Sequence, residues 1–218
     1  MTAALLLALG FAVYPPEGSC DVTESPKHTF RIETYGVQPH ANWIVPRDKK
    51  ASKVVLPDPH NKSENYPYEF SVSPDEQWIV LKQKQYHRAN AAWLYERTTP
   101  LHYAEVKPSA FSGQAWRFLN EHEHRKFIIN DDDYRRIIVI GDFPKVGSQV
   151  RKIDLGNSQK TIVPTANDQA ILICLYGDDF KTDVDSWFCY YDLQKHCFYV
   201  DAALRKHNKG RVTPSHNK

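Results

Sequence analysis

The chain repeats one strand plan four times along its length, and this repeat limits the folds that it can adopt. Each unit has an apolar strand, a loop, a second strand rich in aromatic or aliphatic residues, a polar turn and a short third strand. The units cover residues 29–57, 75–106, 134–163 and 169–200. Because β-branched and aromatic residues dominate all four, the sequence predicts a mostly β fold of repeated antiparallel β-meander units.

One segment between the second and third units follows a different period. In PSAFSGQAWRFLNEHEHRK, five side chains fall on one helical stripe: Phe111, Ala115, Phe118, Leu119 and His122. Ser109 or Ser112 can serve as the N-cap. The pattern predicts one inserted α-helix at about residues 109–125, laid across one end or face of the sheet.

Two short motifs resemble the blades of a β-propeller. Ser73-Pro74-Asp75 followed by Trp78-Ile79-Val80 resembles the S-P-D-G-x-x-[IL] signature of TolB-like and WD-type propeller repeats, with Glu76 standing where the signature has glycine. Asp192-Leu193, after the strand WFCYY, looks like the D-L turn of such blades. The resemblance implies an exported scaffold that engages other proteins, although some relatives are enzymes.

The length of the chain restricts the propeller interpretation. A closed propeller needs at least four blades of about 40–45 residues each. The chain has 218 residues, so four complete blades barely fit once an apolar leader, the helix and a basic tail are subtracted. Each unit also shows three strands, whereas a blade has four. We therefore expect a small or incomplete propeller, or a curved antiparallel sheet or sandwich.

Both ends of the chain differ in composition from its middle. TAALLLALGFAVY is an uncharged apolar run that suits a signal-peptide core and is shorter than the ~20 residues of a transmembrane helix. It predicts a signal segment over residues 1–20, with a buried N-terminal strand or helix as the alternative. Residues 21–204 are expected to form a single β-rich domain. The basic stretch 205–218 is expected to be a disordered tail, with a docking arm as the alternative.

These features predict an exported protein, periplasmic or secreted, without a transmembrane span. Cys20 follows Gly18-Ser19 as in a lipoprotein site, but Glu17 occupies the place of an aliphatic residue, so a lipid-anchored form is not expected. The formal net charge is +2, from 28 basic and 26 acidic side chains. This balance argues against nucleic acid as the partner, because phosphate binding requires a concentrated excess of Lys and Arg.

Two of the four cysteines are candidates for a disulfide. If the chain turns near Leu193, Cys189 and Cys197 lie opposite each other on adjacent strands, within disulfide reach. The alternative is that all cysteines are reduced and act as small hydrophobic residues.

The aromatic residues divide between core and surface. Trp43, Trp78 and Trp93 occupy matching strand positions and are predicted to be buried. Loop positions favour exposure, and exposed aromatic side chains suit a protein or glycan surface. The candidate binding residues chosen on this basis are Tyr66, Tyr68, Tyr86, His87 and Arg88.

A metal site is a weaker alternative. If NEHEHRK is extended, His122 and His124 share a face, and Asp131 and Asp132 could complete a site of nitrogen and oxygen ligands. On a helix the two histidines point apart, and His122 then complements the helix dipole. The sequence lacks a G-x-S-x-G motif and a Gly-rich phosphate loop, so we expect no cofactor.

The sequence therefore favours a non-enzymatic binding or scaffold module that is exported and engages a protein or glycan partner in the cell envelope. The alternative is a hydrolase, metal-dependent or not, that uses His and Asp side chains from loops at one end of the sheet.

Overall fold

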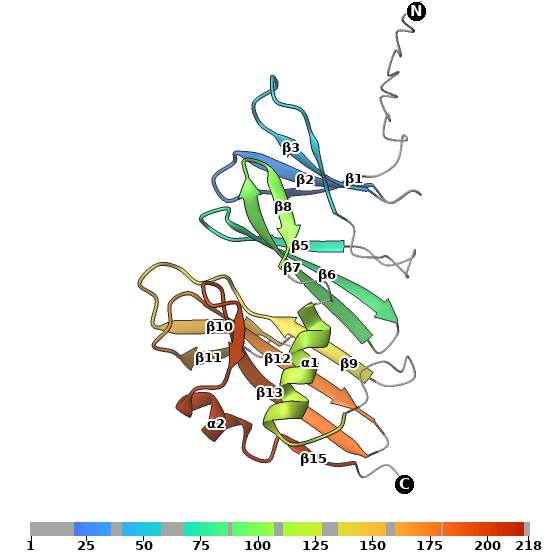
Figure 1. Cartoon of the computed structure of the whole chain (residues 1–218), viewed down its shortest axis with the longest axis vertical. Helices are drawn as coiled ribbons and strands as arrows, with labels where there is room; N and C mark the ends of the chain where they lie inside the picture. The colour runs from blue at the N-terminus through green and yellow to red at the C-terminus, as the bar shows by residue number, and fades with distance from the viewer. Residues whose placement is uncertain are drawn as a thin grey trace, which may run out of the picture.

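The computed structural model describes residues 20–35, 41–57, 68–86, 89–106, 111–127, 135–155, 160–179 and 181–215. Strands dominate these ranges, which confirms the predicted mostly β fold class. The strands form a four-stranded sheet, a two-stranded hairpin and a nine-stranded sheet (Figure 1). In the described ranges these sheets stay open, and no ring of blades closes.

The four-stranded first sheet follows the chain order, with β1 (Cys20–Glu24), β2 (Phe30–Tyr35), β3 (Ala41–Pro46) and β4 (Val54–Leu56). Its faces are set by the alternation in β2, where Phe30, Ile32 and Thr34 are buried and the residues between them are half-buried. Successive side chains of a strand point to opposite faces. The first sheet therefore has an apolar inner face and a mixed outer face.

The second unit adds β5 (Tyr68–Val72), β6 (Trp78–Tyr86), β7 (Ala89–Thr99) and β8 (His102–Glu105), which pair in chain order. The inner face of the first sheet packs on this part of the large sheet, where Ile32 and Ile44 share a buried cluster with Ile79, Leu81 and Tyr95. The first sheet and the second unit thus form a two-layer sandwich, seen in the upper half of Figure 1.

The third and fourth units are interleaved. β9 (Arg135–Ile140) pairs with β12 (Ala170–Asp178), which continues into β13 (Thr182–Asp192) and β14 (Cys197–Tyr199). Between them β10 (Val150–Asp154) and β11 (Lys160–Pro164) leave the large sheet as a separate hairpin. All the strands expected in the four units are present, and β1 and β5 add a leading strand to the first two units.

The two halves of the large sheet meet between β7 and β9, which pair in parallel at a single position, Ala89 opposite Arg136. The side chain of Asn90 strengthens this junction. Its Oδ1 accepts from the backbone N–H of Ile138 at 2.7 Å, and its Nδ2 donates to the Ile138 carbonyl at 3.1 Å. Asn90 thus supplies the donor and acceptor that a longer parallel ladder would have supplied.

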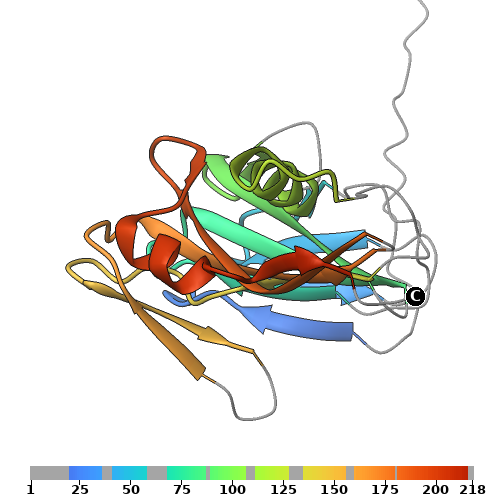
Figure 2. The ribbon, with the colours of Figure 1, turned by 90° about the horizontal axis from the view of Figure 1, so that it is seen from below.

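The predicted inserted helix is confirmed as α1 (Phe111–His122). Its buried side chains include Phe111, Ala115, Trp116 and Leu119, which cover one face of the large sheet. The opposite face is covered by the β10–β11 hairpin and by a second helix, α2 (Ala202–Asn208), through a separate buried cluster. Figure 2 shows α1 and the β10–β11 hairpin on opposite sides of the sheet.

The prediction of a disordered tail from residue 205 is wrong for the described residues up to 215. Asp201 caps α2 by accepting from the backbone N–H of Leu204 at 2.8 Å, and Leu204 itself is buried. After α2, β15 (Val212–Pro214) pairs with β13. The basic composition of this stretch was a poor guide, because its charges lie on the exposed side of α2 while Leu204 and Asn208 face the core.

The described part of the chain contains no helix that is both long enough and apolar enough to cross a membrane. The predicted signal segment, residues 1–20, lies outside the described residues except for Cys20, which begins β1.

Candidate functional site

Two turns of similar geometry lie where the first sheet contacts the large sheet. The turn from Ser73 to Trp78 is closed by a backbone bond from Ser73 N–H to the Trp78 carbonyl at 2.9 Å, and the turn from Ser25 to Phe30 by the same bond at 3.1 Å. The fourth residue of each turn has a positive φ, which is 62° at Glu76 and 56° at His28. Glycine is common at such a position, so Glu76 occupies the conformation for which the propeller signature uses glycine.

The contacts of the Glu76 side chain explain why glutamate, and not glycine, occupies this position. Its carboxylate accepts from the backbone N–H of Lys27 at 2.9 Å and from the hydroxyl of Thr29, while its carbonyl accepts from the Tyr103 hydroxyl at 2.6 Å. Burial alone would raise the pKa of Glu76, but the hydrogen bonds from Ser25, Thr29 and Lys27 outweigh burial and lower that pKa. Glu76 therefore joins the two layers of the sandwich and has a structural role.

The outer face of the first sheet is the strongest candidate for a functional surface. The strand register places Val22, Glu33, Trp43 and Val55 in one row across β1, β2, β3 and β4. Val22 is 52% exposed and Val55 is 49% exposed. We define the outer face as this row together with the side chains that flank it: Cys20, Glu24, Arg31, Tyr35, Val45 and Lys53.

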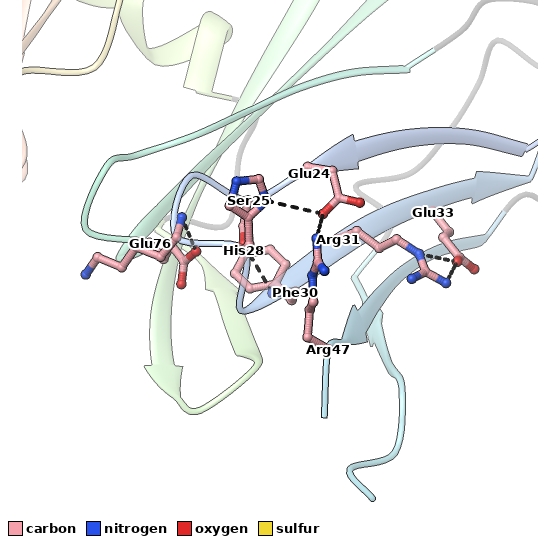
Figure 3. Close-up of polar contacts among 9 residues, drawn as sticks. Glu24, Ser25, His28, Phe30, Arg31, Glu33, Arg47 and Glu76 are labelled. Carbon is pink, nitrogen blue, oxygen red and sulfur yellow. Dashed lines mark hydrogen bonds and ion pairs between the residues drawn. The ribbon is translucent and has the colours of Figure 1, made fainter. Parts of the chain in front are cut away.

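A fixed polar network occupies the middle of the outer face. The Arg31 guanidinium donates through Nε to Oε1 of Glu33 at 2.7 Å, and the Tyr35 hydroxyl donates to Oε2 of Glu33 at 2.6 Å (Figure 3 shows the Arg31 contact). Burial alone would raise the pKa of Glu33, but the hydrogen bonds from Tyr35 and Arg31 outweigh it and hold that pKa below its ordinary value. The hydrogen bond to Glu33 in turn raises the pKa of Tyr35.

An aromatic ring lies beside this network. Trp43 is directly opposite Glu33 on the neighbouring strand and is half-buried. The ammonium group of Lys53 lies over the Trp43 ring, with Nζ 4.2 Å from its centroid. This distance is within the range of a cation–π contact. The outer face thus combines an accessible indole with a cation held on its surface.

The end of the outer face near the first turn carries a second charged group. Glu24 lies between Arg47, whose Nη2 is 3.8 Å from Oε2 of Glu24, and His28, whose Nδ1 is 3.9 Å from the same oxygen (Figure 3). These side chains are substantially exposed, so the contacts add little stability. Arg47 supplies a positive charge beside Glu24 at the edge of the face.

The structure tests few of the binding residues predicted from loop positions. Tyr68 is buried in the core between the two layers, so its prediction as a surface residue is wrong. It begins β5, and its side chain points to the face that the first sheet covers. Tyr66, His87 and Arg88 lie outside the described residues, and Tyr86 ends β6 with a side chain that also lies outside the described part.

The histidines proposed as metal ligands have other neighbours. His122 ends α1, with its Nδ1 3.1 Å from Oε1 of Glu123, and the same carboxylate oxygen accepts from the Trp187 indole at 2.8 Å. His124 follows the helix in a positive-φ conformation. Asp131 and Asp132 lie outside the described residues. Within the described ranges, no three His, Cys, Asp or Glu side chains are grouped in a way that could hold a metal ion.

The predicted Cys189–Cys197 disulfide is not formed, and both cysteines are free. The hairpin turns later than expected, so Cys197 is opposite Asp192 and not opposite Cys189. This register places the two side chains on opposite faces of the sheet. Cys189 is buried on the side covered by α1, whereas Cys197 is exposed.

The loop-based prediction missed the outer face because Trp43 was assigned to the core with Trp78 and Trp93, which are indeed buried. A signal for the correct assignment was present. In FRIETY the apolar Phe30 and Ile32 alternate with charged residues, which identifies the outer face of β2, and the antiparallel partner of Glu33 is Trp43. The motif S-P-x-x-x-[FW] also occurs at both Ser25 and Ser73 and could have revealed the repeated turn.

Comparison of the chain with protein-family models, with curated proteins and with solved structures finds no match.

Proposed function

We propose that this protein is an exported, non-enzymatic binding module of the cell envelope that engages a protein or glycan partner through the outer face of the first sheet. The supporting observation is that exposed valines, an accessible tryptophan and a fixed charge network lie together on one sheet face. Trp43 and Val55 are adjacent in the row across this face, and an exposed apolar patch bordered by polar groups is typical of interaction sites.

The arrangement of the face also favours binding over a purely structural role. Arg31, Glu33 and Tyr35 hold one another in place through hydrogen bonds before any partner arrives. Side chains that are already ordered lose less conformational entropy on association, and this raises affinity. A face that served only to remain soluble would not need an ordered network around a half-buried indole.

The proposal is tested by co-sedimentation of the purified protein with the envelope fraction of the cells that produce it. The Trp43→Ala variant is expected to bind at least about tenfold more weakly, as is usual for an aromatic residue at the centre of an interface. The matched control is Ile162→Ala, which removes an exposed side chain from the β10–β11 hairpin. Equal sedimentation of Trp43→Ala and wild type would contradict the proposal.

The export component of the proposal has a separate test. The intact mass of the protein recovered from the envelope fraction is expected to lack about 20 N-terminal residues, the usual result of signal-peptide removal. A full-length mass in the cytoplasmic fraction would contradict export, while the binding test would still stand on its own.

A further inference from the structure

The outer face lies in a basic part of the chain. Across the whole first sheet and its connections, residues 20–56, the sequence has six Lys and Arg residues and four Asp and Glu residues, so this part carries an excess of two positive charges, while the whole chain has 28 basic and 26 acidic side chains. The carboxylates on the face are already neutralised, Glu33 by Arg31 and Glu24 by Arg47. The surplus charge around the face is therefore positive, and it attracts an anionic ligand.

The size of the face limits what can occupy it. Four strands at a spacing of about 4.8 Å, and six residues at a rise of about 3.3 Å each, give a face of roughly 400 Å². Each partner in a standard stable protein–protein interface buries roughly 800 Å². The face is therefore a better match for a narrow, linear ligand than for a second folded protein.

The chemistry at the centre of the face distinguishes between linear ligands. A peptide strand is recognised mainly through backbone hydrogen bonds at a sheet edge, but these side chains project from the flat of the sheet. A sugar ring has a flat C–H surface that can stack on an indole, and its hydroxyls can bond to the carboxylate and hydroxyl groups of Glu33 and Tyr35. Lys53 lies over the Trp43 ring on an exposed, flexible stem, so a sugar that stacks on the indole displaces its ammonium group to the edge of the ring, where it can pair with an anionic substituent of that sugar.

We propose that the ligand of the outer face is an acidic glycan, in which a sugar ring stacks on Trp43 and a carboxylate of the sugar pairs with Lys53. This inference rests on the proposed function, because it names the ligand class for the same face. Arg31, which is partly exposed beyond its contact with Glu33, lies opposite Val45 on the same sheet face as Trp43 and provides a second donor there.

The inference is tested by isothermal titration calorimetry of the purified full chain with three probes: oligogalacturonate, a neutral β-glucan oligosaccharide of equal length, and polyglutamate peptide. Oligogalacturonate is expected to bind, and to bind more weakly as salt is added, because salt screens the charge pairing. Lys53→Met keeps most of the side-chain stem and is expected to weaken binding about tenfold, which corresponds to about 1.4 kcal/mol. Lys152→Met, on the exposed face of β10, is the matched control and is expected to bind as wild type does.

The outcomes separate this inference from the proposed function. Equal affinity for the neutral oligosaccharide, or tighter binding of polyglutamate, would overturn the acidic-glycan assignment. If none of the three probes binds while envelope co-sedimentation still depends on Trp43, the ligand class is wrong and the binding face stands. If co-sedimentation does not depend on Trp43, both are wrong. The Lys53 side chain is exposed, so Lys53→Met is not expected to alter the fold. The affinity measured for Lys53→Met therefore does not depend on whether Trp43→Ala is destabilised.

Discussion

The side-chain amide of Asn208 pairs with the backbone of Phe188, accepting from its N–H at 2.8 Å and donating to its carbonyl at 2.7 Å. Asn90 makes the same two-bond contact with Ile138. An amide side chain offers one acceptor and two donors, so it can replace a peptide group of a neighbouring strand. In both places the side-chain amide joins two elements at a point where backbone hydrogen bonds do not connect them.

Replacing Asn208 with alanine is expected to lower the free energy of unfolding by about 2–3 kcal/mol, because two buried backbone groups of Phe188 lose their partners. The loss is measured by urea denaturation, and hydrogen exchange of residues 202–215 is expected to become faster. Lys206→Ala, on the exposed side of α2, is the control and is expected to change little. Unchanged exchange in Asn208→Ala would show that the amide does not hold the C-terminal segment.

Glu76 predicts a pH dependence of stability. Its folded pKa is lowered, whereas the unfolded value is about 4.3. The stabilisation from its carboxylate is therefore present above the unfolded pKa and is lost as the pH falls through the folded pKa. Glu76→Gln is expected to cost about 1–3 kcal/mol at pH 7, and this difference from wild type is expected to shrink near pH 3.

The comparison is made by urea denaturation of wild type and Glu76→Gln at both pH values. Glu69→Gln is the control, because Glu69 is exposed and its ion pair with Lys82 contributes little. A difference between wild type and Glu76→Gln that is the same at pH 7 and pH 3 would refute a stabilising carboxylate at this position.

Two glycines have opposite expected responses to alanine. A Cβ at Gly177 would lie 2.5 Å from the Arg135 carbonyl and 2.9 Å from the Trp116 ring, so Gly177→Ala is expected to destabilise the fold by roughly 3 kcal/mol. At Gly113 a Cβ meets nothing within 4 Å, and alanine favours the helix by about 0.8–1 kcal/mol. Thermal unfolding of both variants tests the packing of α1 on β12. A stable Gly177→Ala protein would contradict it.

The corrected strand register predicts which cysteines react. Cys197 is exposed, whereas Cys174 and Cys189 are buried and burial raises the pKa of each thiol. Alkylation of the native protein, followed by peptide mass analysis, is expected to modify Cys197 rapidly without prior reduction, and to modify Cys174 and Cys189 only after unfolding. Cys197→Ser supplies the control. If Cys197 were labelled only after reduction, the predicted Cys189–Cys197 disulfide would be correct and the register described here would be contradicted.

The strands of the four units could be predicted because alternation and β-branched composition are local properties of the sequence. The leading strand β1 was missed because CDVTE lies at a sheet edge and carries no buried residue. YEFSV of β5 alternates apolar and polar residues, so this strand could have been predicted from the same local pattern. The C-terminal segment was missed because its order depends on contacts of Leu204 and Asn208 with distant strands.

The candidate face could be predicted only in part. The alternation of FRIETY identifies which side of β2 is polar, but the position of Trp43 depends on its pairing with Glu33, and the register of β2 and β3 is not contained in either strand alone. The position of Lys53 over the Trp43 ring depends further on the path of the β3–β4 loop. Loop aromatics were therefore chosen where a sheet face was the better candidate.

The central claim is that the outer face of the first sheet binds an envelope partner. The most direct measurement follows the indole N–H signals of the five tryptophans by NMR while solubilised envelope material is added, with Trp43→Phe used to assign the Trp43 signal. The account predicts that the Trp43 signal shifts, while that of Trp187, buried and bonded to Glu123, stays in place. A Trp43 signal that remains unchanged while the protein binds envelope material would contradict the account.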